Sequence, residues 1–134
     1  MTLYVDASAL LKRYVDEPDS DRADQLLAAD EELITARHTL VEVRRNLARL
    51  LRGSALRDAR ISFDTDLASF ALVELDADTC EFAATIAEST GARTLDALYL
   101  GAAQRVGGQA VTVLTFDVRQ AQVARALGFT VLGS

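Results

Sequence analysis

The sequence contains few of the residues that mark secreted or membrane proteins. Cys80 is the only cysteine, so no intrachain disulfide can form, and a reducing compartment is favoured. No apolar run approaches the roughly 20 residues of a membrane-spanning helix, and the N-terminal stretch lacks the basic start and long apolar segment of a signal peptide. We therefore expect a cytoplasmic protein that does not bind membranes.

The motifs of several enzyme classes are absent as well. Lys12 is the only lysine, whereas a phospho-receiver domain needs a lysine after its last strand. Neither a GxxxxGK[ST] phosphate-binding loop nor a GxSxG nucleophile motif occurs. His38, the only histidine, cannot form a zinc site with Cys80, and we interpret it as a surface or capping residue.

What remains is a chain of ordinary globular composition. It has 134 residues, of which 50% are hydrophobic and 25% charged, with one proline and seven glycines. No linker, internal repeat or charge tract divides it. We therefore expect a single domain over residues 1–134, long enough to bury one substantial hydrophobic core.

Short apolar segments alternate with longer segments of helical spacing along the whole chain. The predicted strands cover residues 3–5, 33–36, 71–75, 110–115 and 130–132. The predicted helices cover residues 7–16, 20–29, 38–52, 54–69, 77–89, 94–106 and 117–127. Because parallel strands need crossover connections, this alternation predicts an α/β fold with a parallel sheet between helices.

Acidic residues occur where such a fold binds its ligands, beyond the carboxyl ends of the strands. Asp6 directly follows the first predicted strand, and Asp117 comes shortly after the fourth. Asp96 opens a helix that is otherwise almost wholly apolar, so we expect it to be substantially buried, and Glu42 lies on the 38–52 helix away from its apolar stripe. Carboxylates pressed together repel one another, and a hard divalent cation with oxygen ligands would hold them together.

Each acid also has a structural explanation. Aspartate is favoured at helix N-termini, which alone would account for Asp6, Asp96 and Asp117. Thr39 and Glu42 have the spacing of a capping box. The residues considered singly therefore leave both explanations open.

The net charge of −6 argues at first against a nucleic-acid partner, but the charges are unevenly distributed. Residues 1–32 contain nine acids and three basic residues, whereas residues 37–60 contain seven arginines and two acids. The arginines would form either a positive face that contacts phosphates or the ordinary solvated surface of helices. Arg45, Arg49 and Arg52 lie on the same predicted helix as Glu42 and are candidate contacts to the phosphate backbone of a nucleic acid.

Four segments that contain these acids resemble, in order and spacing, the PIN-domain ribonucleases, in particular the VapC-type toxins of VapBC toxin–antitoxin pairs. The segments are YVDASALLKRY around Asp6, TLVEVRRNLAR around Glu42, RTLDALYLGAA around Asp96 and VLTFDVRQAQVARALGFTVL around Asp117. The resemblance extends from one end of the chain to the other. Unlike some relatives, which carry a further acid or amide shortly after the fourth acid, this chain continues with Val118, Arg119 and Gln120.

The resemblance implies a three-layer α/β/α PIN domain with a five-stranded parallel sheet in the order 3-2-1-4-5. It implies that the four acids form one pocket for one or two Mg²⁺ or Mn²⁺ ions, in which Asp6 and Asp96 are the most dependable ligands. Ser8 and Thr115 match hydroxyl positions near that pocket and would orient carboxylates or water.

The resemblance also implies an activity and partners. Its members hydrolyse RNA, often transfer or ribosomal RNA, as the toxin component of a type II pair, and thereby inhibit translation and growth. A cognate VapB-type antitoxin inserts into the active-site cleft, and homodimers are common. The alternative is a PIN-like metal-binding protein that acts mainly through protein contacts with little nuclease activity. DNA cleavage is a further alternative, although the chain is short for the elements that grip branched DNA.

Overall fold

The computed structural model describes residues 2–29 and 32–134. The strands within these residues are β1 (Thr2–Val5), β2 (Leu33–Ala36), β3 (Ala71–Val73), β4 (Val111–Thr115) and β5 (Thr130–Gly133). The helices are α1 (Ala7–Leu11), α2 (Ser20–Ala28), α3 (Thr39–Leu50), α4 (Gly53–Leu67), α5 (Ala77–Thr90), α6 (Thr94–Val106) and α7 (Val118–Ala126), with a 3₁₀ turn η1 (Gly108–Ala110) before β4. Every predicted strand and helix is present.

Four predicted elements end two or more residues earlier than expected, namely the helices over 7–16, 38–52 and 54–69 and the strand over 71–75. The first and the last of these have a hydrogen-bonded side chain just beyond their ends. The helix predicted over residues 7–16 ends at Leu11, because the chain turns and the Tyr14 hydroxyl bonds Asp66 of α4 at 2.6 Å. The strand predicted over residues 71–75 ends at Val73, because the carbonyl of Glu74 accepts a bond from the Thr79 hydroxyl at 2.8 Å as the chain enters α5. In both places a side-chain hydrogen bond fixes the end of the element.

The sheet is parallel throughout and has the order β3-β2-β1-β4-β5, as the PIN resemblance predicted. β1 pairs with β2 on one side and with β4 on the other, so the strand order reverses between β1 and β4. Val5 lies opposite Leu114 at the end of this pairing. The residues that follow β1 and β4 therefore leave the sheet side by side at its carboxyl edge.

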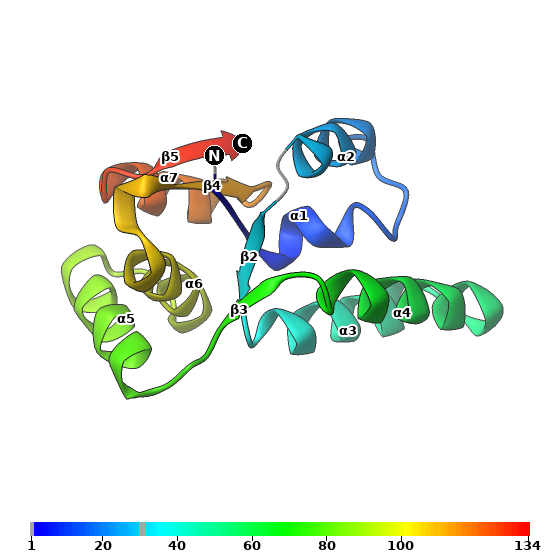
Figure 1. Ribbon diagram of the computed structural model, residues 1–134, viewed down its shortest axis with the longest axis horizontal. Coiled ribbons are helices and arrows are strands. Elements are labelled where there is room, and N and C mark those ends of the chain that lie inside the picture. The colour runs from blue at the N-terminus through cyan, green and yellow to red at the C-terminus, as the bar shows by residue number, and fades with distance from the viewer. Residues whose placement is uncertain (1, 30–31) are drawn as a thin grey trace.

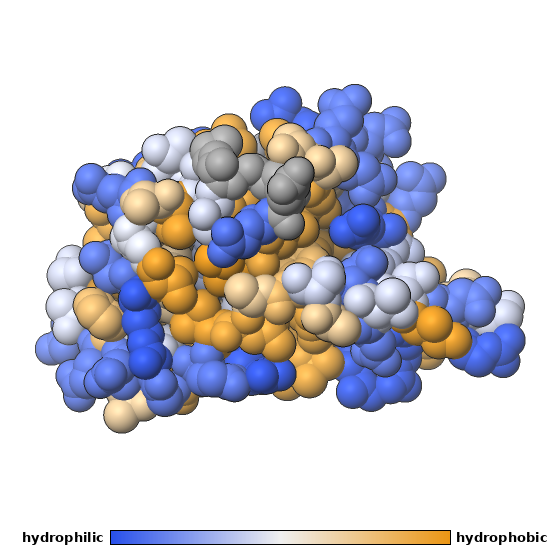
Figure 2. Space-filling model, in the orientation of Figure 1, coloured by the Kyte–Doolittle hydropathy of each residue, from blue (hydrophilic) through white to orange (hydrophobic). Residues whose placement is uncertain are grey.

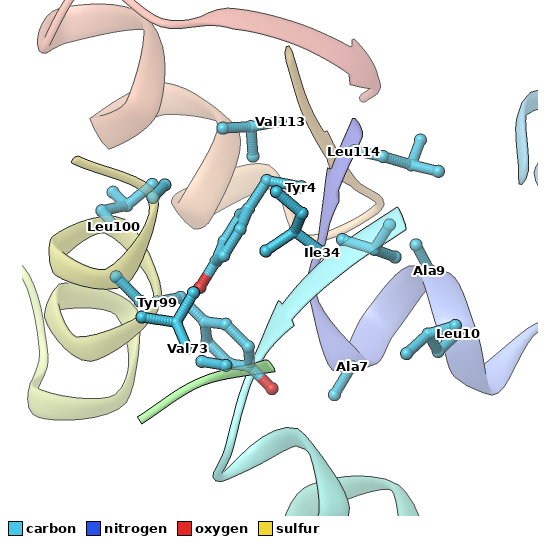
Figure 3. Close-up of a cluster of buried hydrophobic side chains, with 14 of the residues drawn as sticks. Tyr4, Ala7, Ala9, Leu10, Ile34, Val73, Tyr99, Leu100, Val113 and Leu114 are labelled. Carbon is cyan, nitrogen blue, oxygen red and sulfur yellow. The ribbon is translucent and has the colours of Figure 1, made fainter. Parts of the chain in front are cut away.

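Helices cover both faces of the sheet, which gives the predicted α/β/α layering (Figure 1). α1 to α4 lie on one side, and α5, α6 and α7 lie on the other. The central strands are apolar and fully buried, with Leu3, Tyr4 and Val5 each 0% exposed. Figure 3 shows the core around Tyr4, where side chains from α6 and neighbouring strands meet.

The outer surface is mostly hydrophilic over α2 and over the far end of the α3–α4 pair, which projects from the rest of the molecule (Figures 1 and 2). None of the helices in the described ranges has both the length and the apolar character needed to cross a bilayer.

α5 and α6 pack against each other where α6 has a glycine. A Cβ atom added to Gly101 would lie 2.7 Å from the backbone nitrogen of Ala83, closer than real Cβ contacts allow. Gly101 therefore permits the close approach of the two helices, since a backbone atom cannot move aside as a side chain can.

We predict that Gly101→Ala destabilises the protein by about 1–3 kcal/mol, because the clash exceeds the roughly 1 kcal/mol that alanine gains in helix propensity. Chemical denaturation would measure the change. Gln104→Ala, on the exposed face of the same helix, is the control and should change stability by less than about 0.5 kcal/mol. An increase in stability for Gly101→Ala would contradict the close helix contact.

Candidate metal centre

Asp6 lies at the carboxyl end of β1 and caps the N-terminus of α1. Its Oδ1 accepts hydrogen bonds from the Ala9 backbone N–H at 3.2 Å and from the Ser8 hydroxyl at 2.6 Å. The Thr115 hydroxyl donates to its Oδ2. Because the side chain is almost fully buried, these three donors hold the carboxylate in one orientation.

The two hydroxyls connect the ends of β1 and β4. Besides donating to Asp6, Ser8 accepts a bond from the Phe116 N–H at 2.9 Å, and Thr115 accepts one from the Asp117 N–H at 3.1 Å. The structure thus places both predicted hydroxyls against the first acid. They also fix the loop that carries the fourth.

Asp117 caps the N-terminus of α7, where its Oδ1 accepts from the N–H groups of Arg119 at 2.9 Å and Gln120 at 3.3 Å. It is exposed, unlike Asp6. The helix-capping explanation is therefore correct for Asp6 and Asp117. Their capping roles point both carboxylates at the same end of the sheet.

Asp96 lies in the first turn of α6, beside the capping position and not at it. Its side chain is partly buried, and burial is the main cause that raises its pKa, which agrees with the expected burial. The neighbouring Leu95, by contrast, is 51% exposed.

Glu42 lies on the partly buried side of α3, and the capping box predicted for it is wrong. The Thr39 hydroxyl lies 2.7 Å from that of Thr35 and 3.1 Å from that of Tyr99, so it faces the core and not the helix end. Oε1 of Glu42 is buried, and no described residue hydrogen-bonds it.

His38 occupies the N-cap position of α3 but is buried, so its interpretation as a surface residue is wrong. It precedes α3 without a side-chain capping bond, and its ring lies 4.1 Å from that of Tyr99. Burial lowers the pKa of His38 to about 4. In Figure 3 the Tyr99 side chain extends from α6 toward Ala7, and Tyr99 lines the pocket described below.

The four predicted acids all line one pocket of about 730 Å³. The lining also includes four residues that the sequence did not single out for the site, namely Arg93, Tyr99, Arg119 and Gln120. The only sequence signal for the two arginines is their position within the RTLDALYLGAA and VLTFDVRQA segments. Tyr99 and Gln120 resemble ordinary helix residues in sequence, and only their position beneath the pocket distinguishes them.

The carboxylates influence one another across the pocket. Burial, then the charges of Asp6, Asp96 and Asp117, raises the pKa of Glu42 to about 7. Burial also raises the pKa of Asp6 to about 6, against its hydrogen bonds, and Asp117 adds to the rise. The pKa of Asp96 is raised by burial and then by Asp117. Four acids from separate elements therefore converge closely enough to repel one another.

The donor set fits a hydrated hard cation. All the candidate donors are carboxylate oxygens, and Glu42 offers a buried oxygen without a partner. Within residues 2–29 and 32–134, no three acid, histidine or cysteine side chains are gathered closely enough to hold one ion directly. Mg²⁺ usually keeps several waters and binds through one or two carboxylates, and the pocket has room for such waters at about 30 Å³ each.

The three arginines predicted to contact RNA lie outside this pocket. Arg52 turns back on the end of α3 and donates to the carbonyls of Ala48, Arg49 and Leu51. Arg49 bonds the Asn46 side chain at 3.2 Å, and Arg45 is exposed. Their contact with an RNA backbone stays a prediction.

Comparison with known proteins gives the family. A model of the PIN domain matches residues 3–126. The chain belongs to the PIN-domain family. It is 32% identical over 130 residues to ribonuclease VapC46 of Mycobacterium tuberculosis, an alignment that covers 97% of this chain and 95% of the relative.

Solved structures share the fold of this PIN domain. FitAcB from Neisseria gonorrhoeae has a TM-score of 0.75 at 19% identity, covering 96% of this chain and 95% of the other. VapC20 of Mycobacterium tuberculosis, a toxin that cleaves the sarcin–ricin loop, has a TM-score of 0.73 at 21% identity and covers 96% of both chains. The resemblance to VapC-type PIN domains and the predicted fold are therefore confirmed.

We predict that Ser8→Ala and Thr115→Val each weaken Mn²⁺ binding about 10- to 100-fold, because a loosened Asp6 carboxylate no longer points in one direction. Isothermal titration calorimetry would measure the affinity. Thr65→Val is the control, since its exposed hydroxyl only bonds the Ile61 carbonyl of α4 and Thr65 does not line the pocket. Parent-like affinity in both pocket variants would contradict the role of the hydroxyls.

We predict that the metal-free protein loses stability as the pH rises from about 4.5 to above 7 because of Glu42. Its pKa is raised from 4.5 to about 7 on folding, so folding favours the protonated form, and ionisation at higher pH opposes folding. Glu42→Gln removes this contribution and should flatten the pH dependence of unfolding measured with chelator present. The exposed Glu81→Gln is the control. An unchanged pH dependence in Glu42→Gln would show that the carboxylate is not strained by its surroundings.

Proposed function

We propose that this PIN domain is a Mg²⁺- or Mn²⁺-dependent endoribonuclease and the toxin component of a type II toxin–antitoxin pair. The observation that carries the proposal is the convergence of four carboxylates, from four separate elements, on one pocket at the reversal point of the sheet. The 32% identity with a ribonuclease over nearly the whole chain supports the same activity.

The carboxylates of Asp6, Asp96, Glu42 and Asp117 would hold the cation, directly or through water. A bound divalent cation supplies a Lewis acid that activates water and stabilises charge on the phosphate. Ser8 and Thr115 keep Asp6 in place, so that end of the pocket needs no rearrangement when substrate binds.

Glu42 is the better candidate to orient the attacking water and accept its proton. Its Oε1 has no hydrogen-bond partner among the described residues, so it is free to accept a bond from that water. Asp117 is less suited, since its Oδ1 already accepts two backbone bonds.

The biological partners belong to the same proposal. We propose an RNA substrate, possible classes being transfer and ribosomal RNA, and a VapB-type antitoxin that covers the pocket. One solved neighbour of the same fold is a DNA-bound VapBC complex from Salmonella typhimurium, with a TM-score of 0.69 at 14% identity. Inhibition of translation, a homodimer and a cytoplasmic location stay predictions.

We predict that Asp6→Asn and Asp96→Asn each lower the rate of RNA cleavage by about a hundredfold or more, because each removes a charge that holds the cation. Cleavage of total RNA with Mn²⁺ would measure this, and EDTA should abolish the activity of the parent. Asp21→Asn, on the exposed surface of α2, is the control and should cleave as the parent does.

The two functional alternatives give different results in this assay. If the parent shows no Mn²⁺-dependent cleavage of RNA, the protein acts mainly through protein contacts and the nuclease proposal is wrong. If either variant cleaves at the parental rate while remaining folded, the assignment of that carboxylate is wrong.

A further inference from the structure

Beside the acidic pocket lies a rim that combines positive charge with exposed apolar surface. Arg93 and Leu95 belong to the start of α6, and Val118 and Arg119 belong to the start of α7. All four line the pocket. Leu95 is 51% exposed and Val118 is 63% exposed, so both apolar side chains are accessible at the pocket of the four acids.

The two rim arginines are not committed to other protein groups. Among the described residues, no ion pair or hydrogen bond involves either guanidinium, although Arg93 lowers the pKa of Asp96 through its charge. By contrast, Arg37, Arg105 and Arg13 pair with acids. Arg93 and Arg119 are therefore available to a ligand.

We propose that Arg93, Leu95, Val118 and Arg119 form the surface that binds RNA next to the cleaved bond. The two arginines bind phosphates on either side of the scissile one, and the two apolar side chains pack against an unstacked base. This inference rests on the proposed ribonuclease activity and assigns its substrate contacts to specific residues.

Charge balance supports this assignment. Four carboxylates repel a phosphate backbone, and one divalent cation compensates for only half of their formal charge. Two guanidinium groups at the rim supply the remaining compensation where the backbone must pass. Arginine also presents a planar fork of donors that matches the oxygens of a phosphate.

The apolar pair supports a nucleic-acid ligand over a free phosphate or a metal. Single-stranded RNA exposes the faces of its bases, and proteins bind it by combining positive groups for the backbone with apolar surfaces for the bases. Arg93 and Leu95 are two residues apart, and Val118 and Arg119 are adjacent, so each helix start provides one group of each kind.

The test measures binding of a short fluorescein-labelled single-stranded RNA by anisotropy over a series of KCl concentrations. All variants carry Asp96→Asn so that the RNA is not cut. The double variant Arg93→Ala/Arg119→Ala should lose about tenfold in affinity, and the slope of log Kd against log salt should fall by about 1.4, or about 0.7 for each lost phosphate contact. Arg22→Ala/Arg125→Ala is the control, because it removes the same charge from exposed positions outside both the pocket and the arginine-rich segment 37–60.

The apolar part is tested separately by Leu95→Ser/Val118→Ser. This variant should lose affinity several-fold without a change in the salt slope, because a base contact releases no counterions. In the cleavage-competent parent background, Arg93→Ala/Arg119→Ala should raise KM and leave kcat nearly unchanged. Thermal unfolding of every variant confirms that the fold is retained.

Three results would overturn the proposal. The first is parental affinity and salt slope in Arg93→Ala/Arg119→Ala, which would assign these arginines to a protein partner. The second is an equal loss in the control pair, which would show a dependence on net charge alone. The third is unchanged affinity in Leu95→Ser/Val118→Ser. A parent that neither binds nor cleaves RNA would instead refute the proposed function itself.

Discussion

The Asp6 carboxylate lies buried where β1 and β4 end, with its pKa raised to about 6 and with Asp117 adding to that rise. Mutual repulsion among the four carboxylates is the constraint that the surrounding structure must oppose. Backbone N–H groups at the starts of α1 and α7 bind Asp6 and Asp117, and Asp96 lies in the first turn of α6. The positive ends of three helix dipoles therefore face the pocket, so the fold itself compensates for part of its negative charge.

The helix N-termini do not supply a hydrogen bond to every buried polar group around the pocket. Glu42 and Gln120 line it, and each has a buried oxygen that no described residue hydrogen-bonds. The two ring nitrogens of His38, which packs on Tyr99, likewise have no partner among residues 2–29 and 32–134. Buried polar atoms without partners are costly, so stability is lower here than an apolar packing would give. Buried polar groups without partners are expected at a site where a bound ligand supplies the missing interactions.

The tertiary structure, and not the sequence alone, determines which arginines lie close to the acidic pocket. The arginine-rich part of the chain forms α3 and α4, which project from the molecule, and its arginines lie on the outside or bond the helix end. Two isolated arginines, Arg93 and Arg119, lie at the pocket instead. A cluster of arginines in the sequence therefore indicates a positively charged surface. Whether a single arginine at the start of a helix faces the acidic pocket depends on where that helix start lies in the fold.

The sequence by itself determined the alternation of strands and helices, the family, and the placement of Asp6 and Asp117 after strands, because these depend on local hydrophobic patterns and on short segments around each acid. It placed four element ends two or more residues too late, and it predicted a capping box at Thr39 that does not form. Tertiary structure alone decided that the buried His38 packs on Tyr99 and that Tyr99, Arg93 and Arg119 line the pocket of the acids. The physical reason is that helical periodicity fixes which side chains share a face of one helix, whereas the neighbouring element that this face meets is set by packing across the sheet.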